Sequence, residues 1–458
     1  MVAHRHVVPC VALGICAVVT GCAGQANDED LGSTSQAVVS PNTDTFPSTY
    51  ARQWMVNLAN SVKGDGLHPV LAARTYSYGA IAVYEAVVNG MPGYRSLGGQ
   101  LNGLGTMPTP DPGKVYDWPT VLAQTMRRVS METYVFPLRL FFEYTTSTEA
   151  TLDELGPAQI GHRLIAGVTP QVSADSIAFG NQLADKLVPW INSDGYSIAR
   201  FKGWVPPVGP DKWVPTGFQD TDKVANPEEP WYGQIVRPIV LTSPDECRPA
   251  PPVPFDTTPG SPMYNQAKAV YDTENSLTNE QREIANFWAD GPKLTPTPAG
   301  HWLALATKMI RPGNLAQAAY GYAQSMIAVQ DAAIAVWNEK YRSNLLRPET
   351  YIRRHIDAGW QPFLGTPKFP SYISGHSGFS GASARTFAAA FGNNPFTDDT
   401  KLRRGFAPRS FANWEAAAEE AAESRLNGGI HYPMDNQAGL EVGHCVGDKV
   451  IARVHFHI

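Results

Sequence analysis

Apolar residues recur at helical spacing through most of the chain, whereas the alternating pattern of strands is scarce. The spacing predicts four helices in the first half, over residues 50–62, 69–88, 121–134 and 172–187. In the second half it predicts helices over residues 262–270, 279–288, 301–309, 316–347, 376–391, 413–425 and 435–454. The pattern therefore predicts an all-α protein of two packed helical bundles.

Proline and tryptophan interrupt the helical pattern between residues 204 and 262. A helix cannot continue through so much proline. The stretch is nevertheless too apolar and aromatic for a disordered linker. We therefore expect an ordered crossing segment over residues 204–262 that connects an N-terminal bundle (47–203) to a C-terminal bundle (263–458).

The N-terminus has the pattern of a secretory signal peptide over residues 1–21, with a short basic stretch followed by an apolar run. The run ends in Val-Thr-Gly-Cys, which resembles a bacterial lipobox and predicts lipidation at Cys22. Residues 22–46 are polar and small, so we expect a flexible tether. The chain is then an exported protein, either a lipoprotein held at the membrane by its lipid alone or, after ordinary cleavage nearby, a periplasmic or extracellular protein.

The charge and cysteine content limit which binding partners and which disulfides are possible. Charged residues make up 17% of the chain and the formal net charge is -6, so we expect no broad basic surface and no nucleic-acid partner. Cys10 and Cys16 would leave with the signal peptide, and beyond Cys22 only Cys247 and Cys445 remain. Their spacing does not fix their distance, so whether they pair stays open.

A first candidate motif contains two cations near the end of the long helix predicted over residues 316–347. Lys340 and Arg347 are seven residues apart, two helical turns less about 20°, which places both on one face together with Trp337. Pro348 disfavours further helix and leaves Arg347 at a helix end. Taken alone, such a pair more often faces solvent.

A second motif covers residues 369–376 and precedes a helix rich in small residues. Ser374 is a natural N-cap, and the N–H groups of Gly375 and His376 would be unpaired donors at the positive end of the helix dipole. Such an end binds anions. The alternative is an ordinary serine cap followed by a surface histidine.

A third motif begins in a last helical turn with Arg425, because Asn427-Gly428-Gly429 stops the helix. His431 follows in a loop. Asp435 could accept a hydrogen bond from one nitrogen of His431 and leave the other free as a ligand or nucleophile.

Together the three motifs resemble the signature shared by vanadium haloperoxidases and type 2 phosphatidic acid phosphatases. The eleven matching residues are Lys340, Arg347, Pro348, Pro370, Ser371, Ser374, Gly375, His376, Ser424, Arg425 and His431. The resemblance extends upstream through residues 213–216, 230–231 and 287–291, so it covers about residues 204–444. It is closest to the vanadium-dependent haloperoxidases, and it implies the two-bundle fold of that family.

The resemblance implies a role for each matching position. The oxygens of vanadate would be bound by Lys340, Arg347, Ser374, Gly375 and Arg425. His431 would coordinate vanadium, His376 would act as an acid or base on the opposite side, and Lys340 would polarise peroxide. Asp290 resembles an acid that pairs with a site arginine, although its motif is one residue shorter than the fungal form.

Halide preference is suggested by the aromatic pair Trp337 and Phe369, which matches fungal chloroperoxidases, whereas algal bromoperoxidases are expected to carry histidine at the second position. Bacterial iodoperoxidases show similar motif spacing. Because iodide is the easiest halide to oxidise and bromide the next, we expect vanadate-dependent oxidation of iodide or bromide by hydrogen peroxide. The hypohalous acid would then react with a small organic acceptor.

Two alternatives use the same residues. One is a soluble acid phosphatase or phosphotransferase that forms a phosphohistidine at His431. The other is a lipoprotein that binds oxyanions without turnover. The additional N-terminal half and the aromatic wall favour the haloperoxidase. Beyond residue 22 no apolar run is long enough to span a bilayer, which argues against the multi-span lipid phosphatases.

Overall fold

The computed structural model describes residues 39–135, 146–216 and 227–458. The predicted signal peptide and Cys22 lie outside these residues. The helices are α1 (Thr49–Asp65), α2 (Pro69–Val87), α3 (Trp118–Ser130), α5 (Thr146–Ile165), α6 (Pro170–Asn192), α7 (Tyr196–Phe201), α8 (Tyr232–Ile235), α9 (Pro262–Asn275), α10 (Asn279–Phe287), α11 (Thr297–Ile310), α12 (Leu315–Ser343), α13 (Pro348–His355), α14 (Gly375–Phe391), α15 (Trp414–Asn427) and α16 (Pro433–Arg453). Strands β1 (Phe396–Asp398) and β2 (Arg409–Phe411) form a small antiparallel pair. The predicted all-α class is confirmed.

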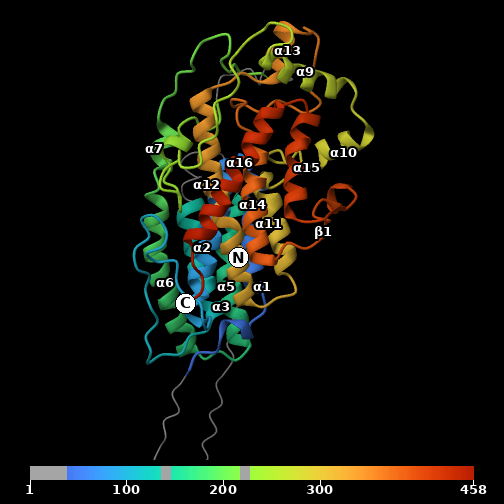
Figure 1. The fold of residues 1–458 in the computed structure, drawn as a ribbon. Coiled ribbons are helices and arrows are strands. Elements are labelled where there is room, and N and C mark those ends of the chain that lie inside the picture. Colours follow the sequence, from blue (N-terminus) through green and yellow to red (C-terminus); the bar gives the residue numbers. More distant parts are fainter. Residues whose placement is uncertain (1–38, 136–145, 217–226) are drawn as a thin grey trace, which may run out of the picture. The chain divides into compact units, whose positions relative to one another are not determined.

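Helix α12 is the central element of the unit formed by residues 39–458 (Figure 1). Helices α2, α11, α14 and α16 all pack against it. Almost every residue of α12 from Leu315 to Tyr341 is buried, so the helix has no polar face. A helix that is buried all round needs neighbours on every side, and here they come from both halves of the sequence.

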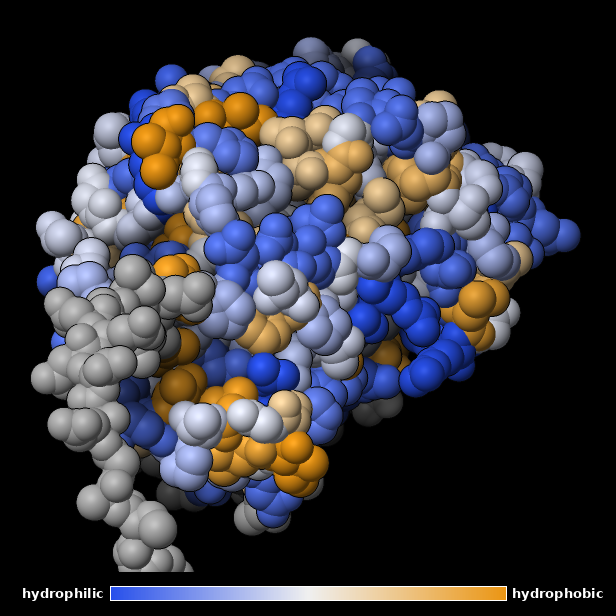
Figure 2. All heavy atoms as spheres, turned by 90° about the horizontal axis from the view of Figure 1, so that it is seen from below, coloured by the Kyte–Doolittle hydropathy of each residue, from blue (hydrophilic) through white to orange (hydrophobic). Residues whose placement is uncertain are grey.

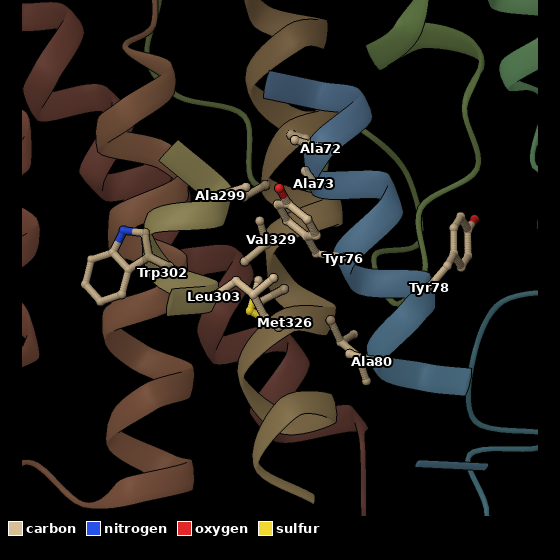
Figure 3. Packing of buried hydrophobic residues seen from close by; sticks show 14 of the residues in the cluster. Ala72, Ala73, Tyr76, Tyr78, Ala80, Ala299, Trp302, Leu303, Met326 and Val329 are labelled. Atoms are coloured by element: carbon tan, nitrogen blue, oxygen red, sulfur yellow. The ribbon is translucent and has the colours of Figure 1, made fainter. Parts of the chain in front are cut away.

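Small residues bring α2 close to α12 and α11 (Figure 3). Ser77 of α2 donates a hydrogen bond of 2.6 Å to the carbonyl of Met326 in α12. The packed side chains around this point are Ala72, Ala73, Tyr76 and Ala80 of α2, Met326 and Val329 of α12, and Ala299 and Leu303 of α11. The N-terminal half of the chain thus contributes directly to the core around α12.

Glycines let α14 and α16 lie in direct contact. A Cβ atom at Gly443 would lie 2.4 Å from the carbonyl oxygen of Gly378, and one at Gly439 would lie 2.7 Å from that of Ser374. Such distances leave no room for a side chain. The start of α14, which carries the second motif, is therefore held tightly against the first turns of α16.

The crossing segment is anchored at two points. The buried carboxylate of Asp331 in α12 accepts hydrogen bonds from the N–H groups of Ile239, Val240 and Leu241, at 2.5 to 2.8 Å. A disulfide joins Cys247 to Cys445 in α16, with 5.8 Å between the Cα atoms. This answers the question that the sequence left open about these two cysteines.

The ordered, packed part of the chain begins at an earlier residue than the sequence predicted. Residues 39–46 belong to the predicted tether, yet Thr43 donates a hydrogen bond of 2.9 Å to the carbonyl of Val87. Trp118 donates one of 2.8 Å to the carbonyl of Pro41, and the side chain of Phe46 is buried. The tether prediction is wrong for these residues because their partners lie in α2 and α3, far along the sequence.

The helix predicted over residues 316–347 is also too long. α12 ends at Ser343, because Asn344 adopts a left-handed conformation (φ 49°) that caps the helix. Arg347 instead precedes α13 as its N-cap residue. Lys340 and Arg347 therefore do not share one helical face, and they approach each other through the turn between two helices.

The surface seen in Figure 2 is mostly polar, and apolar residues appear on it in separate patches. Such patches are usual on folded proteins whose large apolar side chains are mainly buried. No helix in the described part of the chain is both long and apolar enough to cross a membrane.

Candidate active site

A cavity of about 480 Å³ brings residues of all three motifs together. Its walls include the predicted site residues Trp337, Phe369, Gly375, His376, Arg425 and His431. Much of the remaining wall is apolar, with Leu364, Phe379 and Ile430 among its residues. An apolar cavity with a few convergent polar groups is the usual form of a small-ligand site.

His431 lies in the loop between α15 and α16, and its side chain is 3% exposed. Its Nδ1 atom donates a hydrogen bond of 2.7 Å to Oδ2 of Asp435, as the sequence predicted. This bond places the lone pair on Nε2, which faces Nη1 of Arg347 at 3.0 Å. Burial, together with the charges of Arg347 and Lys340, lowers the pKa of His431 well below its usual value. His431 is therefore neutral, which is the form that binds a metal centre.

Three buried cations surround His431. Arg347 donates from Nε to the carbonyl of Phe369 at 2.8 Å and from Nη1 to that of Ile430 at 2.9 Å. Lys340 donates to two backbone carbonyls of the second motif, each at 3.0 Å. Burial lowers the pKa of Lys340 well below its usual value and that of Arg347 and of Arg425 to about 10, and the charge of Asp435 opposes the shift of Lys340 and Arg347. Within the described ranges none of these cations forms a salt bridge to a carboxylate, so the site holds an excess of positive charge.

The start of α14 is built as the sequence predicted. The Ser374 hydroxyl accepts hydrogen bonds from the backbone N–H of Ser377 at 3.4 Å and from its hydroxyl at 2.9 Å, and Ser374 is the N-cap. Gly375 and His376 follow in the first turn and line the cavity. Their N–H groups lie at the positive end of the helix dipole, which favours an anion here.

His376 presents a nitrogen with no protein partner. In the described part of the chain, Nε2 of His376 is buried and makes no hydrogen bond. Burial lowers the pKa of His376 well below its usual value, and the nearby charge of Arg425 lowers it further. A neutral imidazole with a free nitrogen at the wall of a cavity can take up or release a proton there.

The residues present fit a tetrahedral oxyanion. Nη2 of Arg347 is buried and has no hydrogen-bond partner among the described residues. The same is true of Nε2 of His376. An unsatisfied buried guanidinium N–H is costly, and an anion bound among the three cations would accept a hydrogen bond from Nη2 of Arg347. The predicted ligands Lys340, Arg347, Ser374, Gly375, Arg425 and His431 are all close to this point, although Lys340, Arg347 and Ser374 lie behind the cavity wall. Their individual roles remain predictions.

The aromatic pair predicted for the halide lies in the cavity wall. The ring centroids of Trp337 and Phe369 are 5.0 Å apart. The Phe369 ring also lies 4.8 Å from Nζ of Lys340 and 4.9 Å from Cζ of Arg347. An apolar wall backed by cations suits a large, weakly hydrated anion.

Asp290 has different partners from those that the resemblance implied. It lines the cavity, but Oδ2 lies 2.8 Å from Nδ1 of His301 and Oδ1 pairs with Lys401. Arg425 instead donates to the hydroxyl of Ser424 and to the carbonyl of Ala285. Among the described residues Asp290 forms no direct ion pair with a site arginine, because His301 and Lys401 occupy both carboxylate oxygens, but its charge still opposes the lowering of the pKa of Arg425.

Sequence reasoning missed two contributors to the site. Ser371 was part of the second motif but had no assigned role, and its hydroxyl donates a hydrogen bond of 2.5 Å to Asp435. Glu228 lines the cavity from the crossing segment, and burial raises its pKa. Nothing near Glu228 in the sequence indicates its position, since it lies about a hundred residues before the first motif.

Comparisons with known proteins show the family of this chain. Residues 321–458 match the family model described as the VCPO second helical-bundle domain. The solved structure of a bacterial vanadium-dependent iodoperoxidase is 34% identical with a TM-score of 0.80, over 90% of this chain and 97% of that chain. A holo-type bacterial vanadium-dependent chloroperoxidase shares the fold at 14% identity and a TM-score of 0.63, over 85% of this chain and 94% of that chain. The comparison with curated protein sequences gives no match. The predicted family is confirmed, and the chain belongs to the vanadium-dependent haloperoxidases, which are peroxidases that use vanadate as their cofactor.

Proposed function

We propose that this protein oxidises iodide with hydrogen peroxide, using vanadate bound beside His431, and that bromide is a poorer substrate. The observation that carries the proposal is the neutral Nε2 of His431 among three buried cations, at the wall of an aromatic cavity. The iodide preference is supported by the bacterial iodoperoxidase that is 34% identical. Iodide is also the most easily oxidised of the halides considered.

The residues that would hold vanadate follow from the site. Nε2 of His431 would bind vanadium, and Lys340, Arg347 and Arg425 would balance the negative charge of the oxygens. The Ser374 hydroxyl and the Gly375 N–H would complete the set as hydrogen-bond donors. When bound, vanadate supplies Lewis-acid activation of hydrogen peroxide without a change in its own oxidation state.

The remaining residues prepare the cavity for the reaction. Asp435 fixes the tautomer of His431 through the bond at Nδ1. His376 can hold or release a proton at its free Nε2 atom. Trp337 and Phe369 form an apolar wall that excludes water and accepts a poorly hydrated halide.

The test is peroxide-dependent iodide oxidation by the purified full-length protein, before and after incubation with orthovanadate. We expect activity that depends on vanadate and that falls at least about 100-fold in His431→Ala. The matched control is His455→Ala, which changes an exposed histidine. Hydrolysis of a chromogenic phosphate ester is measured in parallel. Ester hydrolysis that vanadate inhibits, without iodide oxidation, would instead identify the phosphatase, and binding of vanadate with neither activity would identify a non-catalytic protein.

We also propose export of the protein and lipidation at Cys22. The disulfide between Cys247 and Cys445 supports export, because disulfides persist mainly in oxidising compartments. Cells fed with labelled fatty acid should incorporate label into the wild type and not into Cys22→Ala. A wild type without label would contradict lipidation.

A further inference from the structure

A buried network of charged residues lies against one wall of the cavity. His301 of α11 is enclosed between two carboxylates, with Nδ1 at 2.8 Å from Asp290 and Nε2 at 2.7 Å from Asp398. Lys401 forms an ion pair with the second oxygen of Asp290. All four side chains are buried, and Asp398 is further fixed by hydrogen bonds from Thr400.

The geometry determines the charge of this network. A carboxylate accepts hydrogen bonds and cannot donate them, so both ring nitrogens of His301 must carry a proton. The positive His301 and Lys401 then balance the negative Asp290 and Asp398. Charges buried without such compensation would be strongly unfavourable.

The network is connected to the cavity through the segment that follows α10. Asp290 lines the cavity beside His376 and Arg425, and it adopts a left-handed backbone conformation with φ of 44°. Trp288 stacks on His301, with ring centroids 4.4 Å apart. The position of Asp290 therefore depends on contacts with His301 and Lys401 rather than on local helical structure.

We infer that His301 and Lys401 are positioning residues that hold Asp290 in the cavity wall and cancel its charge, so that the cavity can accept a halide anion. Without these two cations, the negative charge of Asp290 would be opposed mainly by Arg425, which lines the same cavity, and it would weaken the attraction of the site for a halide. The inference rests on the proposed function, since it concerns the halide that enters this cavity. In this view the network affects how tightly the cavity binds an anion, and it takes no part in the chemical step.

Removal of one cation and then of the charge that it balances tests this inference. We expect Lys401→Met to raise the KM for iodide about tenfold while kcat changes less than about threefold. The double variant Lys401→Met/Asp290→Asn should restore KM to within about threefold of the wild type, because it removes one charge of each sign. Arg403→Met, which removes an exposed cation from the same segment, is the matched control.

Binding measurements separate this inference from the proposed function. Calorimetric titration with orthovanadate requires no turnover, and we expect weaker binding in Lys401→Met and recovery in the double variant. If the wild type binds vanadate but oxidises no halide, the proposed function fails while the titrations still test the network. Unchanged KM and vanadate affinity in a folded Lys401→Met, or a double variant as impaired as the single, would overturn the inference. If Lys401→Met does not fold, the Asp290→Asn variant tests the inference instead. It removes the negative charge, so we expect a lower KM for iodide. A higher KM would contradict the charge argument.

Discussion

Ser371 and Asp435 share a hydrogen bond of 2.5 Å that joins the second motif to the third. The acceptor is Oδ2 of Asp435, and the same oxygen accepts the hydrogen bond from Nδ1 of His431. Burial raises the pKa of Asp435 to about 6, although the bond from Ser371 and the charge of Lys340 oppose the shift. Two motifs separated by some fifty residues thus control the orientation of one imidazole ring.

Asp435→Asn should weaken vanadate binding about tenfold, because a neutral amide polarises the His431 ring less and can turn a donor toward it. Calorimetric titration of the cofactor-free protein with orthovanadate measures the effect. Glu441→Gln is the control, since it removes an exposed carboxylate from the same helix. Equal affinities in the wild type and Asp435→Asn would exclude this role of Asp435.

Because of Glu85, we expect the free energy of unfolding to decrease as the pH rises toward neutrality. Its carboxyl is fully buried in α2, and burial raises its pKa from 4.5 to about 7 although Leu97 and Ser96 donate hydrogen bonds to it. Between these two values the folded state holds a proton that the unfolded state has lost, so the free energy of unfolding decreases with rising pH. Glu85→Gln should abolish this contribution, which is on the order of 3 kcal/mol.

Urea denaturation at pH 4.5 and pH 8 measures the Glu85 effect, on the wild type, on Glu85→Gln and on Glu154→Gln as an exposed control. The difference between the two pH values should shrink only in Glu85→Gln. An unchanged difference in that variant would show that another group is responsible.

Gly443→Ala should destabilise the protein by roughly 1–3 kcal/mol, because the added methyl group overlaps the backbone of α14. The displacement would reach the first turn of α14, so vanadate affinity should fall as well. Gly161→Ala in α5 is a matched glycine-to-alanine change with no atom within 4 Å of the new Cβ. Thermal unfolding of both variants, monitored by circular dichroism, compares them, and equal midpoints would contradict the close contact.

Loss of the Cys247–Cys445 disulfide should lower the free energy of unfolding by about 2–5 kcal/mol, because the bond closes a long loop. The double variant Cys247→Ser/Cys445→Ser tests this by urea denaturation. Reductant should destabilise the wild type and leave the double variant unchanged. A wild type that is insensitive to reductant would show that the bond does not form in solution.

The parts of the site that could be predicted from the sequence are those with local causes. The Ser374 cap, the glycines after α15 and the short interval from His431 to Asp435 each act within a few residues. A local pattern therefore identified both the residue types and their orientation. The spacing of the three motifs then indicated that they belong to one site.

Long-range contacts account for what the sequence did not reveal. The partners of Asp290 are 11 and 111 positions away, and the two cysteines are 198 positions apart. Periodicity carries no information about such contacts. The position of Arg347 was also missed, although its cause is local. The left-handed conformation of Asn344 ends α12, so Arg347 lies outside that helix.

The burial of α12 on all sides restricts how this site could be moved to another protein. The segment matched by the family model begins at residue 321, inside α12, and it carries every oxyanion motif. Yet Tyr232 of the crossing segment bonds both to Gln330 of α12 and to the carbonyl of Val70 in α2. A graft of the C-terminal segment alone would expose the face of α12 that α2 and the crossing segment now cover. The binding motifs are therefore short and local, but the smallest portable unit that carries them includes the N-terminal half of the chain.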